Sequence, residues 1–286
     1  MGNISATQVK ELREKTGLGL MDCKKALEEA NGDLDLAIEE LRKTSGLKAS
    51  KKSSRSAADG LIGIKISEGK SFMVEINCET DFVARDDSFN LFMAEVLEIV
   101  SSNGDKSLEE LLEEGIEEKR EKLVQKLGEN IVVRRIVASE DNSDSSGVYL
   151  HSNNKIGTII SLKGGTEQVA KDIAMHAAAS DPLAISPSDI PQEVIDKERE
   201  IYKAQSEDSG KSAEIVEKMI EGKIKKFLSE VSLTEQNFVK DPSLTIKGML
   251  DESNASILGF ARFEVGEGIE IEKVDFASEV MSQIEG

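Results

Sequence analysis

The chain has 286 residues, a length that suits two or more domains, and 38% of its residues are hydrophobic, which is enough to build ordinary cores. A formal net charge of −19 argues against wide contact with nucleic-acid phosphates, which so acidic a surface repels. The sequence shows no run of about 18 apolar residues and no secretory leader, so we expect a cytoplasmic protein without a membrane span. The two cysteines, Cys23 and Cys78, form no disulfide framework and are expected to be reduced and buried. These properties favour another protein as the partner.

Residues 3–46 show the spacing of three short helices. Ser5 and Gln8 match a capping box at the start of the first helix, and Asp33 precedes the third helix as an N-cap. About 45 residues build only a modest core, so we expect this module to dock onto a partner rather than to house chemistry.

A basic stretch follows the three helices in this otherwise acidic chain. Its four cations lie among serines and alanines: Lys48, Lys51, Lys52 and Arg55. This composition favours a flexible, solvated linker, with contact to an acidic partner as the alternative.

The apolar period changes from helical to alternating after residue 60. Ile62, Ile64 and Ile66 form one alternating run, and a Ser-Glu-Gly-Lys turn leads to a second run over 72–78, which predicts a β-hairpin. Two amphipathic helices and a strand over 131–137 follow.

A shorter version of this unit recurs after the polar residues 141–146. Strands are predicted over 148–151 and 156–162, followed by a helix over 169–177. The pattern predicts an α+β fold in which two related core subdomains each carry an antiparallel sheet.

Between Pro182 and Leu233 charged residues surround narrow apolar stripes, which predicts an inserted antiparallel helical hairpin. This arm could serve dimerisation or docking, or it could pack only against itself. A strand over 257–265 and a last helix that includes Phe276 complete the predicted order.

The predicted elements divide the chain into five expected segments. They are a docking module with its linker (1–54), a first core subdomain (55–140), a second core subdomain (141–180 and 230–265), the inserted hairpin (181–229) and a C-terminal module (266–286).

Residues 75–85 are the most informative part of the sequence. Apolar and polar residues alternate in the first half, which predicts a strand with one buried face and with Glu75 and Asn77 on the other. Asp81 and Phe82 then lie between this strand and the next helix, where a turn can hold side chains out towards a partner. The alternative is a charged turn with Phe82 folded back onto the core.

A search for catalytic chemistry finds little. The two histidines, His151 and His176, have no metal-ligand company, so a zinc site is not expected. Cys78 and His151 could act as nucleophile and base, but Cys78 is predicted on the inward face of its strand, where a thiol is ordinarily inert. No glycine-rich phosphate loop is present. We therefore expect no enzyme activity, no catalytic residue, no metal and no cofactor.

Four stretches together resemble one protein family. Residues 12–27 (LREKTGLGLMDCKKAL) and 75–85 (EINCETDFVAR) are similar to the two signatures of bacterial elongation factor Ts, and residues 173–176 and 262–269 are similar to later blocks of that family. The resemblance covers nearly the whole chain. It implies a guanine nucleotide exchange factor that binds the GDP complex of elongation factor Tu, expels GDP and leaves the GTPase free to load GTP. The alternative is a ubiquitin-associated-type adaptor built on the three-helix module.

The resemblance places the residues that act on the partner directly after the predicted strand. They are Thr80, Asp81, Phe82 and Val83. It implies that Phe82 pushes between side chains of elongation factor Tu, and that Asp81 disturbs the magnesium ion and its water ligands, so that phosphate binding weakens.

Further contacts with elongation factor Tu are implied at Leu20, Met21, Leu127, Gly128 and His151. Each position also has a purely structural alternative. Leu20 and Met21 could close the helical core, Leu127-Gly128 could end a helix, and His151 could lie at a strand edge. The partner is expected in its GDP-bound and nucleotide-free forms, without direct contact to nucleic acid, and a homodimer or a 2:2 complex through the hairpin stays open.

Overall fold

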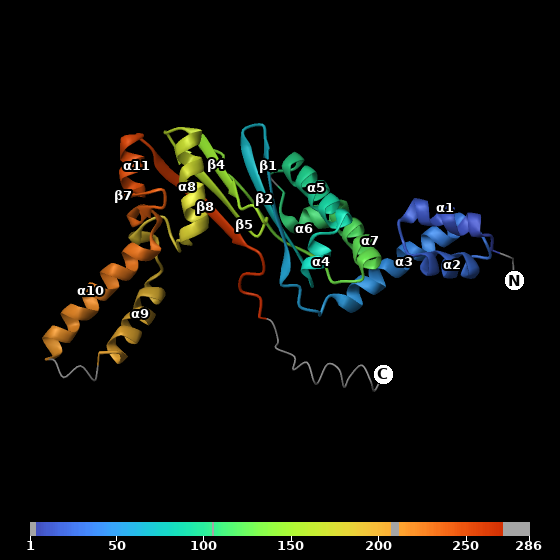
Figure 1. Cartoon of the computed structure of the whole chain (residues 1–286), viewed down its shortest axis with the longest axis horizontal. Coiled ribbons are helices and arrows are strands. Elements are labelled where there is room, and N and C mark those ends of the chain that lie inside the picture. Colours follow the sequence, from blue (N-terminus) through green and yellow to red (C-terminus); the bar gives the residue numbers. More distant parts are fainter. Residues whose placement is uncertain (1–3, 105, 207–211, 271–286) are drawn as a thin grey trace. The chain divides into compact units, whose positions relative to one another are not determined.

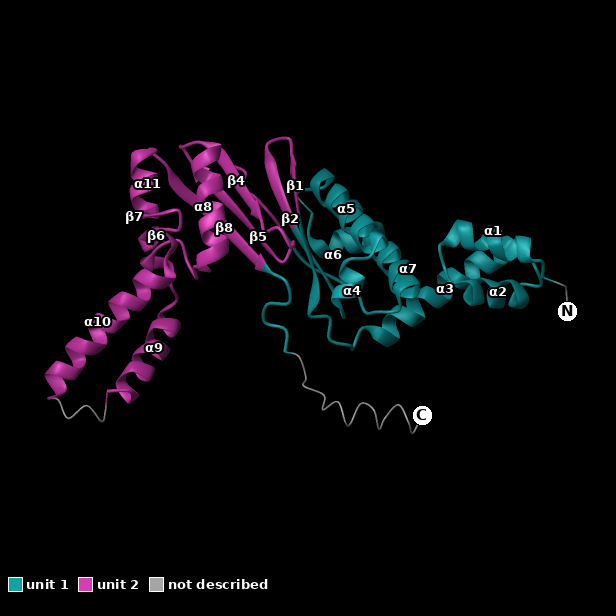
Figure 2. Ribbon diagram, in the orientation of Figure 1, with its two compact units in different colours: residues 1–63, 74–136, 264–286 teal, residues 64–73, 137–263 magenta. Residues whose placement is uncertain are grey.

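A computed structural model describes residues 4–104, 106–206 and 212–270 of the chain. Figure 1 shows the helices and strands coloured along the sequence. The chain divides into two compact units (Figure 2): unit 1 comprises residues 1–63, 74–136 and 264–286, and unit 2 comprises residues 64–73 and 137–263. Helices alternate with small sheets in the element order, so the predicted α+β class is confirmed. The finer division into five segments stays a prediction.

Three helices begin unit 1, as the sequence predicts: α1 (Ala6–Thr16), α2 (Leu20–Glu29) and α3 (Leu34–Lys52). The capping box is formed, because the Gln8 N–H donates to Ser5 Oγ (3.2 Å) and the Ser5 N–H donates to Gln8 Oε1 (3.0 Å). The helices enclose a small apolar core, whose buried members are Val9, Leu12, Leu18, Cys23, Ala26, Leu27, Ala30, Ala37 and Leu41.

The predicted flexible linker is wrong, because α3 continues to Lys52 and includes three of the four cations. Ala49 is buried, and Lys48 pairs with Asp22 (3.0 Å). The Lys52 ammonium donates to the carbonyl of Gly128 (2.5 Å). The serines and lysines of this stretch are compatible with a helix, and packing against α7 (Glu117–Leu127) supplies the support that local composition does not show.

The first sheet has the order β1-β2-β3, with strands β1 (Asp59–Ser67), β2 (Lys70–Cys78) and β3 (Val132–Ala138), and it includes the predicted hairpin. Helix α5 (Asp87–Ser102) lies against β1, since a Cβ added at Gly63 would approach Met93 Sδ to 2.6 Å. The short helix α6 (Leu108–Leu111) and the π-helical turn η1 (Leu112–Ile116) lead into α7.

Unit 2 contains the recurring hairpin and helix that the sequence predicts. Strands β4 (Ser145–Leu150) and β5 (Ile156–Lys163) pair antiparallel with Val148 opposite Ile159, and β8 (Ser256–Glu264) completes the order β4-β5-β8. Helix α8 (Glu167–Ser180) packs on this sheet, and Thr158 Oγ1 donates to the Ala174 carbonyl (2.7 Å).

Shorter elements of unit 2 close its core. They are the 3-10 turns η2 (Pro187–Asp189) and η4 (Leu233–Glu235), the antiparallel strands β6 (Asn237–Phe238) and β7 (Asp241–Thr245), and helix α11 (Ile246–Glu252). Ile246, Met249 and Leu250 of α11 pack into the same buried cluster as α8 and β5.

The two charged helices α9 (Gln192–Ala204) and α10 (Ala213–Val231) lie side by side (Figure 1). Arg199 on α9 pairs with Glu217 on α10 at 2.7 Å. The predicted last helix with Phe276 lies outside the described residues. None of the described helices is long and apolar enough to cross a membrane.

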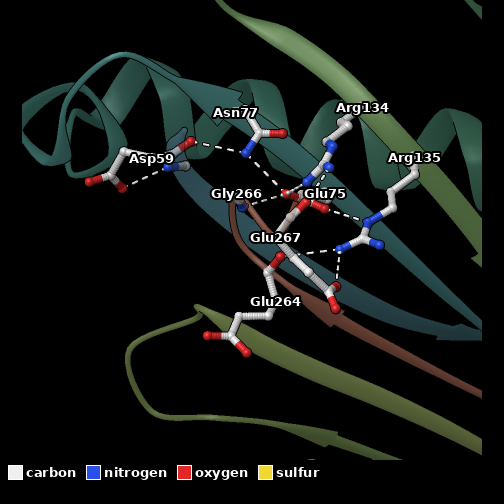
Figure 3. A network of polar contacts seen from close by, with 9 residues as sticks. Asp59, Glu75, Asn77, Arg134, Arg135, Glu264, Gly266 and Glu267 are labelled. Carbon is white, nitrogen blue, oxygen red and sulfur yellow. Dashed lines mark hydrogen bonds and ion pairs between the residues drawn. The ribbon is translucent and has the colours of Figure 1, made fainter. Parts of the chain in front are cut away.

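Strand β2 is buried on both faces, which differs from the sequence prediction. Glu75 and Asn77 were predicted on the face opposite the core, yet Glu75 is 0% exposed and Asn77 is 1% exposed. Polar partners on β3 and on the turn after β8 cover this face (Figure 3). The alternation of apolar and polar residues therefore marks two different buried environments, one hydrophobic and one ionic.

The Glu75 carboxylate is the centre of that ionic environment. Arg135 Nε lies 2.5 Å from Oε2, and Arg134 Nη1 lies 3.1 Å from Oε1. The Gly266 N–H and the Asn77 amide also donate to Oε1, at 2.9 and 3.0 Å. Gly266 has a φ of 75°, and a Cβ there would meet the Ala58 carbonyl oxygen at 2.1 Å, so only glycine fits beside β1. Burial alone would raise the pKa of Glu75, but the bonds from Gly266, Asn77 and Arg135 outweigh it and hold the pKa below its ordinary value.

We expect Glu75→Gln to lower the free energy of unfolding by about 2–3 kcal/mol, because it leaves two arginines without a buried charge partner while both keep some water. The ionised carboxylate favours the folded state above the unfolded pKa near 4.5, and this contribution is lost as pH falls through the lower folded pKa. Urea unfolding between pH 7 and pH 3 should therefore show a shallower acid loss in the variant than in the parent. The exposed Glu252→Gln is the control and should stay within about 0.5 kcal/mol of the parent.

Candidate functional site

The predicted acid–aromatic pair lies on a short helix, α4 (Asp81–Ala84), immediately after β2. Thr80 is its N-cap, and Thr80 Oγ1 accepts a hydrogen bond from the Val83 N–H (3.4 Å). The Phe82 side chain is 81% exposed, whereas Val83 is only 8% exposed. The alternative in which Phe82 folds back onto the core is therefore wrong. We call Thr80, Asp81, Phe82 and Val83 the tip.

The charged member of the tip is held only lightly. Asp81 Oδ2 lies 2.7 Å from Arg85 Nη2, one helical turn further along the chain, and the two side chains are 44% and 78% exposed. Exposed pairs of this kind contribute about 0–1 kcal/mol, since water competes for both charges. The Asp81 carboxylate can therefore leave Arg85 at small cost when a stronger cation is presented.

Glu129, a residue that the sequence patterns did not reveal, holds the backbone at the start of the tip. The Glu129 carboxylate accepts three hydrogen bonds from the corner between β2 and α4. The N–H groups of Glu79 and Thr80 donate to Oε2 at 3.1 and 3.0 Å, and Thr80 Oγ1 donates to Oε1 at 2.6 Å. Hydrogen bonds to an ionised carboxylate are stronger than neutral ones, so the corner has a defined backbone path.

The same corner returns a hydrogen bond to the loop that carries Glu129. Glu79 Oε1 accepts the N–H of Asn130 (2.6 Å), and the Asn130 side-chain amide donates to the carbonyl of Arg55 (2.8 Å). With the bond from Lys52 to the Gly128 carbonyl, three chain segments meet here. We call the contacts among residues 52–55, 79–80 and 128–130 the clamp.

The predicted contacts Leu127 and Gly128 are brought next to the tip by this clamp. Gly128 ends α7 as a left-handed C-cap with a φ of 79°, and it is exposed while Leu127 is half-buried. The helix-ending function of Gly128 is thus confirmed, and a partner contact at the same place stays a prediction. Leu127 and the tip are thus connected through the hydrogen bonds that Glu129 makes with Glu79 and Thr80.

Leu20 and Met21 are the first two residues of α2, in the three-helix module, and so belong to a different part of unit 1 from the tip. Their side chains are 55% and 71% exposed, so the alternative in which they close the helical core is wrong. Two adjacent exposed apolar residues on a small module provide a surface that favours a protein partner.

His151 belongs to unit 2, directly after β4, and is exposed. Its Nδ1 lies 3.0 Å from the hydroxyl oxygen of Tyr149. The two side chains line a mostly apolar cavity of about 340 Å³ together with Ile156, Met175, Ala178, Ala179, Val239 and Lys240. A partner contact at His151 stays a prediction.

Cys78, the candidate nucleophile, and His176, the second histidine, both have structural partners. Cys78 is buried, and its Sγ–H donates to the Thr80 carbonyl (3.1 Å). His176 is buried; its Nδ1 accepts the Val239 N–H (3.2 Å), which leaves Nε2 to donate to Gln236 Oε1 (2.9 Å). Burial lowers the pKa of His176 below its ordinary value despite the bond to Gln236, so the ring is neutral near pH 7. Within the described ranges, no cluster of three or more His, Cys, Asp or Glu side chains could hold a metal ion.

Comparison with known proteins gives matches along the whole chain. The sequence profile of the family described as Elongation factor TS matches residues 79–267. Elongation factor Ts of Hahella chejuensis is 54% identical over 288 aligned positions that cover 100% of both chains. Elongation factor Ts of Marinobacter nauticus is 53% identical over 98% of this chain and 97% of its own length. Elongation factor Ts of Francisella tularensis subsp. novicida is 48% identical over 100% of both.

These matches define a translation elongation factor, and the α+β fold agrees with them. The profile match covers more than half of the chain, and full-length bacterial relatives share about half of its residues. The chain belongs to the elongation factor Ts family, as the resemblance of its signature segments implied.

We expect Phe82→Ser to change the free energy of unfolding by less than about 0.5 kcal/mol, since the ring is already in water. Val83→Ala, the matched change one residue away, should cost about 1–2 kcal/mol because it empties space beneath the tip. Urea unfolding at pH 7 measures both. A larger loss for Phe82→Ser than for Val83→Ala would mean that the ring is packed in solution.

Proposed function

We propose that the chain is a guanine nucleotide exchange factor for elongation factor Tu. It binds the GDP complex, weakens the hold on magnesium and phosphate, and remains bound to the nucleotide-free form until GTP enters. The observation that carries the proposal is the Phe82 ring, 81% exposed beside an acid on a hydrogen-bonded corner. Membership of the elongation factor Ts family supports it.

Each residue of the tip has a distinct task in this proposal. Phe82 inserts between side chains of the partner and displaces them, and Asp81 disturbs the magnesium ion and its water ligands. Magnesium bridges the phosphate oxygens of a bound nucleotide, so loosening the ion weakens the binding of the nucleotide. Every 1.4 kcal/mol removed from that binding speeds release about tenfold, so a few such increments are sufficient.

The proposal requires no reacting group in this chain. Because coupling between two ligands is reciprocal, a factor that lowers the affinity for GDP is itself bound less tightly once nucleotide returns. The exchanger is thereby released and can act again, although no covalent bond is made or broken. Cys78 and His176, each with a structural partner, are consistent with such an activity.

The wider set of partner contacts belongs to the same proposal. Leu20 and Met21, Leu127 and Gly128, and His151 contact elongation factor Tu outside the tip. The chain acts in the cytoplasm without direct contact to nucleic acid, which its charge of −19 disfavours. The hairpin of α9 and α10 is the surface at which a homodimer or a 2:2 complex would form.

The adaptor alternative rests on the three-helix module alone. The family profile matches residues 79–267, which lie outside that module, and full-length relatives carry the elongation factor name. These findings favour the exchange factor over the adaptor. Capture of ubiquitin-like proteins, together with no binding to elongation factor Tu, would reverse the preference.

We expect Phe82→Ala to slow GDP release at least about tenfold at a saturating concentration of the chain. Asp81→Ala should slow release less, because a single charge at a hydrated site weakens GDP binding less than the displacement of partner side chains does. Stopped-flow release of fluorescent GDP from elongation factor Tu measures both. Ile66→Ala, which removes another exposed apolar side chain, is the control for loss of surface area. Arg85→Ala frees Asp81 and should not slow release. Rates equal to the parent for both tip variants would rule the mechanism out.

A further inference from the structure

The tip has few sources of order within itself. Helix α4 has four residues, far fewer than the length of about 12 at which an isolated helix becomes even marginally stable. Burial of Val83 and Ala84 anchors its second half. Its first half, where Thr80 leads into Asp81, gains nothing from burying Phe82, because that ring faces solvent. Hydrogen bonds must therefore determine how the tip leaves the strand.

From this geometry we infer that Glu129 is a positioning residue for nucleotide exchange, and the inference rests on the proposed function. Its carboxylate is occupied within the chain, since it accepts hydrogen bonds from the N–H groups of Glu79 and Thr80 and from the Thr80 hydroxyl. Thr80 Oγ1 in turn caps the helix that carries Asp81 and Phe82. Glu129 thus sets the direction of the tip through one intermediate side chain, that of Thr80.

The chemistry of these three bonds explains why one residue has this effect. Both oxygens of the carboxylate are used. The two backbone donors are Glu79, the first residue after β2, and Thr80, the N-cap of α4, whose N–H groups have no acceptor within the helix. Removing the carboxylate leaves two partly buried N–H groups without their acceptor, so the corner must reorganise or admit water.

The clamp also joins two predicted contact surfaces into one rigid part. Glu129 follows Leu127 and Gly128 directly, and its neighbour Asn130 donates its backbone N–H to the Glu79 carboxylate. The bonds between residues 79–80 and 129–130 therefore run in both directions. Leu127, Gly128 and the tip keep a fixed spacing in the free protein, which spares the complex the entropy of ordering them on contact.

The test uses the full chain with Glu129→Ala and Glu129→Gln. Glu113→Ala, which removes an exposed acid on η1 at the opposite end of α7, is the control. Amide hydrogen exchange followed by NMR should show Glu79 and Thr80 exchanging at least about tenfold faster in Glu129→Ala, with the β1-β2 hairpin unchanged. Glu129→Gln keeps one oxygen and should lie between the parent and Glu129→Ala. Unchanged protection of Glu79 and Thr80 would show that the clamp does not hold the corner.

Stopped-flow GDP release then separates positioning from general support. We expect Glu129→Ala to lower the rate at saturating chain about tenfold, with a smaller change in the concentration for half-maximal rate. Because Glu129 acts through the tip, Glu129→Ala combined with Phe82→Ala should be no slower than Phe82→Ala alone. Additive losses would overturn the inference. If the parent chain itself fails to speed release, the exchange function is wrong; if Phe82→Ala slows release and Glu129→Ala does not, only the positioning role is wrong.

Discussion

The position of the exposed tip depends on one carboxylate, that of Glu129, which accepts hydrogen bonds from the backbone of the corner between β2 and α4. An exposed phenylalanine has a standing tendency to collapse onto apolar surface, because burial of its ring is favourable by about 2 kcal/mol. Here the collapse is prevented from both sides. Val83 and Ala84 already fill the space beneath α4, and Glu129 holds the chain just before it. The ring is left outward because the folded corner offers it no place inside.

The rigidity of that corner extends into the sheet that supports it. Strand β2 leads directly to Thr80. Its polar face, with Glu75 at the centre, is covered by arginines from β3 and by the turn at Gly266. A strand covered on both faces cannot shift register or twist freely, since either movement would expose charge partners or apolar side chains. Under the proposed function, unit 1 as a whole would therefore resist the force on Phe82 when its ring displaces side chains of the partner.

Sequence periodicity predicted the elements well where local rules decide them. The Ser5 capping box and the hairpin after residue 60 follow from spacing and capping chemistry, whereas spacing left the exposure of Phe82 open and the family resemblance indicated it. Three features could not be found in this way. Glu75 alternates like a solvent-facing residue, the lysines up to Lys52 have the composition of a linker, and Glu129 follows a helix-ending glycine like any loop acid. Each is decided by a partner far away in the sequence, namely Arg134 and Arg135, helix α7, and the corner at Thr80.

The weak pairing of Asp81 with Arg85 is compatible with the proposed exchange function, in which the carboxylate must act repeatedly. A carboxylate that is buried among strong hydrogen-bond and ion-pair partners would be unable to approach a magnesium ion. An unpaired carboxylate, in contrast, would be repelled by the negative charge of the bound phosphates at every encounter. An exposed partner one turn away offers an intermediate solution, because it holds the charge weakly in the free chain and releases it for less than about 1 kcal/mol. The tip therefore combines a backbone that is fixed with a charge that is free to move. In the proposed mechanism, steric displacement of partner side chains requires the fixed backbone, and the approach of Asp81 to a hydrated magnesium ion requires the movable carboxylate.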